Sequence, residues 1–149
     1  MQKAKEMDND ELVLLAGATG YLGTYIAKEL SERSMKTKII ARNTKKAMQF
    51  ANNNTTVINA EVTNANTLKG LFEGITTVIS TVGITRQKDG LTYMDVDYQA
   101  NKNLLEEAKR AGVKKFIYVS VLNGKQHRNL KIIEAKEAFV DELIASGID

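Results

Sequence analysis

The segment Gly17-Ala18-Thr19-Gly20-Tyr21-Leu22-Gly23 decides the fold of this chain. It follows the apolar run 12–16 and opens the amphipathic stretch 21–33, so the order is strand, glycine-rich turn, helix. In that arrangement the backbone N–H groups at the helix N-terminus can hold a pyrophosphate. The segment therefore predicts a nucleotide-binding unit.

Each of the three glycines has a separate predicted role. Gly17 allows a sharp turn, Gly20 lets a phosphate approach the backbone, and Gly23 lets the helix pack closely on the strand. The G-x-x-G-x-x-G spacing differs from the dehydrogenase G-x-G-x-x-G, and a glycine triplet alone can mark only a tight turn. Its place after a strand, with a basic residue closing the next strand, favours dinucleotide binding. We expect the intervening Thr19, Tyr21 and Leu22 to contact the cofactor as well.

Five apolar runs alternate with helical patterns along the chain. The predicted strands are 12–16, 37–41, 55–60, 76–82 and 115–121, and the predicted helices are 21–33, 44–52, 66–72, 92–111 and 130–145. Continuous apolar stretches such as 116–119 are typical of parallel strands buried on both faces. Right-handed crossovers then predict a doubly wound, three-layer α/β (Rossmann) sheet of order 3-2-1-4-5, with the nucleotide where strands one and four diverge.

Length and composition indicate one domain. The 149 residues, 43% of them hydrophobic and 26% charged, suit a flexible leader at 1–10 and a globular domain at 11–149. The absence of cysteine rules out disulfides, thiolate catalysis and cysteine-type zinc sites, and we predict no metal site. The sequence has no apolar run of about twenty residues, and its net charge of +3 is too weak for a nucleic-acid footprint. We therefore expect a cytoplasmic protein with neither a membrane nor a nucleic acid as partner.

Arg42 closes the second predicted strand, where NAD-preferring proteins usually carry Asp or Glu to bind the ribose hydroxyls. An arginine there suits a 2′-phosphate. Lys45 and Lys46 follow in the first turn of the next helix, where the helix dipole disfavours positive charge and an anion would offset that cost. The alternative is an ordinary solvated basic loop. NADP is therefore the expected cofactor, and NAD stays possible.

The ends of the third and fourth predicted strands supply further candidate contacts. Glu61 and Val62 would lie near the adenine ring, although Glu61 could equally be an ordinary carboxylate at a strand end. Thr81 and Val82 run into Gly83, and a glycine at a strand end usually marks a close approach or a turn. We expect all five residues to contact the cofactor.

Ser120 ends the fifth predicted strand, beside the expected nicotinamide. Its hydroxyl could orient a substrate carbonyl or merely cap the strand. Lys136 would lie on the same side of the sheet if the last helix returns over this strand, and its alternative role is a solvated helix lysine. His127 lies in a polar run, which predicts a solvated loop residue in preference to a catalyst.

The sequence resembles the atypical, extended-like short-chain dehydrogenase/reductases, especially the NmrA-like NAD(P)H-binding group. The resemblance covers nearly the whole chain from Leu12 onward, and it rests on segment 17–23 and on the stretch 103–120, which reads NLLEEAKRAGVKKFIYVS. It implies an NAD(P)-binding Rossmann domain in which Arg42 favours NADP. Family members continue past a segment like 145–149 into a sixth strand and a smaller substrate-binding part, which the resemblance implies is lacking.

Family enzymes use a serine together with a tyrosine and a lysine spaced Y-x-x-x-K. Ser120 matches the serine and Lys136 the lysine, so the resemblance implies catalytic roles for both. The tyrosine position holds Ile132, and the family's helix asparagine falls at Asp97. Several members of the NmrA-like group also lack the tyrosine: some reduce substrates with the lysine alone, and others only sense the redox state of the cofactor.

Three functions follow as expectations. The favoured one is an NADP(H)-dependent oxidoreductase that passes hydride to an unknown small substrate, with Lys136 holding the ribose and Ser120 orienting the substrate. The rival is a non-catalytic dinucleotide sensor that binds a protein partner when its cofactor changes state. A nucleotide-sugar epimerase shares the glycine segment but ordinarily needs the absent tyrosine. Tyr93 and Tyr98 could supply a replacement phenol, and the spacing selects neither.

Overall fold

A computed structural model describes residues 10–84 and 90–149 of the chain, so most of the predicted leader lies outside the described residues. The strands are β1 (Val13–Ala16), β2 (Thr37–Ala41), β3 (Thr55–Asn59), β4 (Thr77–Ser80) and β5 (Lys115–Tyr118). The α-helices are α1 (Tyr21–Glu32), α2 (Thr44–Ala47), α3 (Asn101–Ala111) and α4 (Lys131–Ser146). Short 3₁₀ helices, η1 (Met48–Phe50), η2 (Ala65–Leu68) and η4 (Gly124–His127), and one π-helix, η3 (Met94–Ala100), complete the elements.

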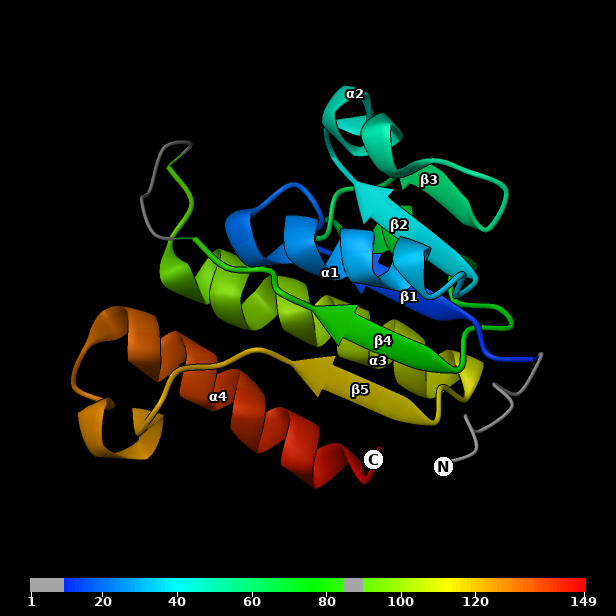
Figure 1. Cartoon of the computed structure of the whole chain (residues 1–149). Helices are drawn as coiled ribbons and strands as arrows, with labels where there is room; N and C mark the ends of the chain where they lie inside the picture. Colours follow the sequence, from blue (N-terminus) through cyan, green and yellow to red (C-terminus); the bar gives the residue numbers. More distant parts are fainter. Residues whose placement is uncertain (1–9, 85–89) are drawn as a thin grey trace, which may run out of the picture.

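The five strands form one parallel sheet of order β3-β2-β1-β4-β5, which confirms the predicted doubly wound topology (Figure 1). Ala16, at the end of β1, lies opposite Ile40 of β2 on one side and Ser80 of β4 on the other. The chain leaves β1 toward β2 and later returns to β4 on the opposite side of β1. The carboxyl end of β1 is therefore the switch point at which nucleotides bind in this kind of sheet.

Side chains alternate along the strands and build a separate apolar layer on each face of the sheet. Leu14 of β1 packs with Leu104 of α3 and Phe139 of α4, in a layer that covers one face. Leu15 of β1 packs with Ala27 of α1, in a smaller layer on the other face. Because both faces are covered, all four residues of β1 are buried, as expected for a central parallel strand.

The predicted helix at 66–72 is wrong. The chain forms only the 3₁₀ turn η2 there, because Gly70 adopts a φ of +75°, which ends any helix. The predicted helix at 44–52 is divided into α2 and η1, and the strands β1, β3, β4 and β5 are shorter than predicted. The helix before β5 ends at Gly112, as predicted.

Strand β5 is also less buried than its apolar sequence predicts. Phe116 is buried and packs on Phe139 of α4, with their ring centroids 5.7 Å apart. Ile117, on the opposite face, is 43% exposed. The prediction that both faces of 116–119 are covered is therefore wrong, because α4 packs on the Phe116 face.

The segment before α3 is the π-helix η3 and not the start of a continuous α-helix. π-Helical turns are rare and frequently occur at functional sites. Here the turn carries Asp97 into the interior, where the carboxylate is 0% exposed. A buried charge of this kind needs a partner, which the site supplies.

Candidate functional site

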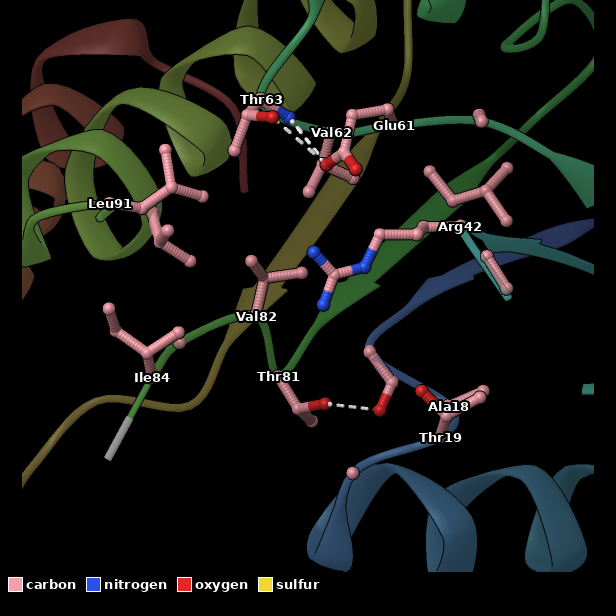
Figure 2. Close-up of a pocket in the computed structure, with 17 residues that line it drawn as sticks. Ala18, Thr19, Arg42, Glu61, Val62, Thr63, Thr81, Val82, Ile84 and Leu91 are labelled. Carbon is pink, nitrogen blue, oxygen red and sulfur yellow. Dashed lines mark hydrogen bonds between the residues drawn. The ribbon is translucent and has the colours of Figure 1, made fainter. Parts of the chain in front are cut away.

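A cavity of about 490 Å³ opens at the carboxyl ends of β1, β2, β3 and β4 (Figure 2). The predicted cofactor contacts in its lining are Gly17, Thr19, Gly20, Arg42, Glu61, Val62, Thr81, Val82 and Gly83. Tyr21, Leu22, Gly23, Ser120 and Lys136 do not line it. The structure thus brings together residues from four separate predicted strand ends, as the topology requires.

The glycine turn between β1 and α1 has the tight geometry that the sequence predicts. Gly17 has a φ of +97°, a conformation that favours glycine. A Cβ atom on Gly23 would lie 2.6 Å from the carbonyl carbon of Gly17 and closer still to its oxygen. The turn and packing roles of these two glycines are confirmed. Gly20 is exposed, and a Cβ atom on it would meet the Gly17 carbonyl oxygen at 3.4 Å. Its phosphate role stays a prediction.

The N-terminus of α1 is open to an anion. Its N-cap residue is Gly20, and no side chain within residues 10–84 and 90–149 caps it; the first turn also contains no acidic residue. The side chains of Tyr21 and Leu22 are 86% and 42% exposed. The first N–H groups of a helix have no partner within the helix and carry its positive dipole end, so this turn fits a pyrophosphate.

Arg42 follows β2 and extends its guanidinium group into the cavity, between the Glu61–Val62 turn and Thr81–Val82 (Figure 2). The next residue, Asn43, caps α2 by accepting a hydrogen bond from the Lys46 N–H. Lys45 and Lys46 are exposed and do not line the cavity. Arg42 is therefore the basic residue of this group that faces the cavity.

Glu61 and Val62 lie in the turn that follows β3, because β3 ends at Asn59. Glu61 Oε1 accepts hydrogen bonds from Thr63 Oγ1 at 2.9 Å and from Thr63 N at 3.3 Å. Asn103 Nδ2 of α3 donates to the Val62 carbonyl at 2.9 Å. These bonds hold the turn in place at the edge of the cavity.

A buried hydrogen-bond network fixes the end of β4. Ser80 Oγ donates to Asn101 Oδ1 at 2.5 Å, and Asn101 Nδ2 donates to the carbonyls of Val82 and Asp97. Thr81 Oγ1 donates to the Gly17 carbonyl at 3.2 Å and so ties β4 to the glycine turn. Sequence reasoning missed Asn101. The feature that could have pointed to it is a polar residue four positions after Asp97, on a helix face that is otherwise apolar.

Lys136 of α4 forms an ion pair with Asp97, with 2.8 Å between Nζ and Oδ1. The other carboxylate oxygen, Oδ2, accepts from the Ile84 N–H at 3.2 Å. The Lys136 side chain is only 14% exposed, so the alternative of a solvated helix lysine is wrong. The Asp97 position, which departs from the family pattern, thus supplies the counter-charge for the lysine.

Two buried hydroxyl groups have no hydrogen-bond partner among the described residues. They are Tyr118 Oη, in the last residue of β5, and Ser120 Oγ, two residues beyond it. The Tyr118 ring lies 5.8 Å from Lys136 Nζ, and burial, together with the Asp97 and Glu137 carboxylates, raises the pKa of its phenol. Buried polar atoms without a protein partner are satisfied by water or by a ligand group.

Tyr118 is the phenol that sequence reasoning missed. Of the two tyrosines it considered, Tyr98 donates its hydroxyl hydrogen to Glu142 Oε1 at 2.9 Å and belongs to a half-buried network with Lys102. Tyr118 lies outside the Y-x-x-x-K spacing because it comes from a strand and not from the helix of Lys136. Its signal is its position two residues before Ser120, near the end of the fifth predicted strand.

None of the helices in the part of the chain that the structure describes is long and apolar enough to cross a membrane. No group of three or more His, Cys, Asp or Glu side chains in residues 10–84 and 90–149 could hold a metal ion. His127 is exposed in η4.

Comparison with known proteins agrees with the geometry of the cavity. The profile of a family described as NAD(P)H-binding matches residues 17–149. The photosystem II assembly factor Ycf39 of Synechocystis sp. is 26% identical over 137 residues, which are 92% of this chain and 42% of that protein. The chain therefore spans less than half the length of this relative.

Solved structures show the same fold. The NADPH-dependent quinone oxidoreductase QOR2 of Escherichia coli, crystallised with NADPH, is 26% identical, with a TM-score of 0.74 over 91% of this chain and 46% of that one. The enzyme WbmH of Bordetella bronchiseptica, crystallised with NAD⁺, is 19% identical, with a TM-score of 0.78 over 93% of this chain and 54% of that one. At 19% identity the second likeness shows the fold alone.

Proposed function

The chain belongs to the NAD(P)H-binding family, and from this premise we propose that it is an NADP(H)-dependent oxidoreductase of the atypical short-chain dehydrogenase/reductase type. The observation that carries the choice of NADP is the position of Arg42, whose guanidinium group extends into the cavity that also contains the uncapped N-terminus of α1. A pyrophosphate and a 2′-phosphate would each meet positive charge in one cavity.

The proposed roles of the α1 N-terminus and Arg42 follow from their places in the cavity lining, and those of Lys136 and Ser120 follow from the family resemblance. The first N–H groups of α1 bind the pyrophosphate, and Arg42 binds the 2′-phosphate. Lys136, held by Asp97, binds the ribose on the β4 side, while the hydroxyls of Ser120 and Tyr118 orient a substrate oxygen. NADPH supplies the hydride when it is bound. The substrate is a small molecule with an acceptor carbon that this hydride can reach.

Replacing Arg42 by alanine should weaken NADPH much more than NADH, because only NADPH carries the 2′-phosphate. We expect a loss of about 1.5–3 kcal/mol for NADPH, the usual worth of a hydrogen bond to a charged group. Calorimetric titration of both cofactors measures it. Lys45→Ala is the matched control, since it removes one positive charge from an exposed neighbour outside the cavity. Equal losses for NADPH and NADH would reject the role of Arg42.

Turnover should be slow, because Ile132 occupies the position of the tyrosine acid and general acid catalysis commonly supplies about 10²–10⁴ in rate. A panel of aldehydes, ketones and enones, followed by NADPH absorbance, tests for it. Lys136→Met should lower any activity at least about tenfold. Lys131→Met, at the exposed start of the same helix, should leave it unchanged. Equal activity of the Lys136 and Lys131 variants would contradict the assignment.

A dinucleotide sensor is the second candidate, and the absence of the tyrosine at Ile132 favours it. The relative from Synechocystis is named as an assembly factor, a name that describes no turnover. On this hypothesis no member of the substrate panel reacts, yet NADP⁺ and NADPH bind with different affinities and differently change the binding of a partner protein. That combined outcome would replace the oxidoreductase proposal.

A further inference from the structure

The ion pair of Asp97 and Lys136 is more enclosed than a surface salt bridge. Asp97 is fully buried, and 14% of the Lys136 side chain is exposed. The contact between Nζ and Oδ1 is an approach of charges at 2.8 Å in which Oδ1 accepts no well-aligned hydrogen bond, whereas Oδ2 accepts one from Ile84 N. Water and salt screen such a pair weakly, so both charges act on their surroundings.

Gly83, which lines the cavity, packs directly against this pair. A Cβ atom built on Gly83 would lie 2.6 Å from Asp97 Oδ1 and 2.9 Å from Lys136 Nζ. Gly83 and Ile84 themselves line the cavity. The absence of a side chain at position 83 therefore lets two opposite charges lie directly behind the β4 side of the cavity wall.

The inference rests on the proposed function, in which Lys136 binds a ribose on the β4 side. In the inference this ribose is the one that carries the nicotinamide. Arg42 marks the opposite, β2 side for the 2′-phosphate, and the N-terminus of α1 between them binds the pyrophosphate. The oxidised nicotinamide ring carries a positive charge, and the reduced ring is neutral. A charge behind this wall therefore acts differently on the two redox states.

We propose that Asp97 sets the relative affinity of the site for oxidised and reduced cofactor, by neutralising the positive charge of Lys136 beside the nicotinamide. An asparagine at this position would leave the lysine charge uncompensated and would penalise the oxidised ring. The carboxylate instead makes the wall neutral overall, so that the site accepts both redox states. Asp97 acts on the cofactor through space and is a positioning residue for Lys136.

Other charges do not replace this pair. The neighbouring Glu137 is also buried, but its Oε2 lies 3.4 Å from Arg128 Nη2, and its carboxylate packs against Gly124. Tyr118 stays neutral because burial raises the pKa of its phenol. Arg42 and Glu61 line the cavity on the β2 and β3 side. Among the described residues, Asp97 and Lys136 are thus the charged groups packed against Gly83.

The test measures the dissociation constants of NADP⁺ and NADPH for the purified chain and compares their ratio, Kd(NADP⁺)/Kd(NADPH). Asp97→Asn should raise this ratio about tenfold. A unit charge roughly 10 Å from the oxidised ring, at an effective dielectric of about 20, changes the affinity for NADP⁺ by about that factor. Lys136→Met should lower the ratio by a similar factor. The double variant, Asp97→Asn with Lys136→Met, should restore the ratio of the unmodified chain.

Glu137→Gln is the matched control, because it neutralises a buried carboxylate one residue from Lys136 that packs against Gly124. It should leave the ratio unchanged, and a shift as large as that of Asp97→Asn would overturn the inference. If Lys136→Met does not fold, Asp97→Asn and the double variant still test the inference. A folded Asp97→Asn variant that binds both cofactors with an unchanged ratio would overturn the inference and leave the proposed function standing. If the unmodified chain binds neither cofactor, the proposed function fails, and the inference fails with it.

Discussion

Replacing Gly23 by alanine should prevent the chain from folding stably. The added Cβ would lie 2.6 Å from the carbonyl carbon of Gly17 and 3.0 Å from Ala18 Cα, so it would meet backbone that cannot rotate away. Helix α1 would have to move off the turn and lose the packing of Ala27 and Leu30 beneath it. We expect a loss of at least about 3 kcal/mol, the upper end of the cost of overpacking, which is a large part of the stability of a small domain.

Urea denaturation without cofactor measures this loss. The matched control is Gly20→Ala in the same turn, because its Cβ would meet only the Gly17 carbonyl oxygen, at 3.4 Å. That variant should lose about 1 kcal/mol, the cost of a poor N-cap residue. Similar stabilities of the Gly23 and Gly20 variants would show that α1 does not depend on the close approach at Gly23.

A second large effect is expected from Gly20→Val, which should remove cofactor binding and leave the fold intact. Gly20 has an extended backbone, with φ −80° and ψ 173°, that valine readily adopts, and a Cβ atom there would make an ordinary contact with the Gly17 carbonyl oxygen at 3.4 Å. The branched side chain would fill the space in which a phosphate meets the first N–H groups of α1. We expect NADPH affinity to fall at least about 100-fold, or roughly 2.7 kcal/mol.

Titration calorimetry with NADPH, alongside a thermal melt of the free protein, separates binding from folding. The NADPH affinity of Gly20→Ala should lie between those of Gly20→Val and the unmodified chain, because one methyl group obstructs the phosphate less than an isopropyl group. If Gly20→Val melts near the unmodified chain and still binds NADPH with unchanged affinity, the glycine turn is not where the pyrophosphate binds.

The order of the elements and the topology could be predicted from the sequence because they depend on local patterns. Apolar runs of strand length alternate with helical stretches, and right-handed crossovers then leave little choice of strand order. The cavity lining was predictable for the same reason, since Arg42, Glu61 and Gly83 each follow a strand whose end the topology brings to one edge. These features need no knowledge of side-chain packing.

The rest depends on contacts between distant parts of the chain. The ion pair of Asp97 and Lys136 joins residues on separate helices, and no spacing rule connects them. The apolar pattern of the segment that carries Asp97 fits an α-helix as well as a π-helix, so periodicity could not distinguish the two. The exposure of Ile117 depends on which elements cover β5, and a strand's own sequence does not contain that information.

The two apolar layers on opposite faces of the sheet have a consequence for local opening of the native protein. The smaller layer joins α1, α2 and η1 to the sheet with few buried side chains. We therefore expect this side to be the less stable cooperative unit, whose amide hydrogens exchange at a lower free-energy cost. The cavity takes its lining from both layers, with Ala18 from the smaller and Val82 from the larger. A dinucleotide that binds there links the two units, and its binding free energy raises the cost of opening the weaker one alone.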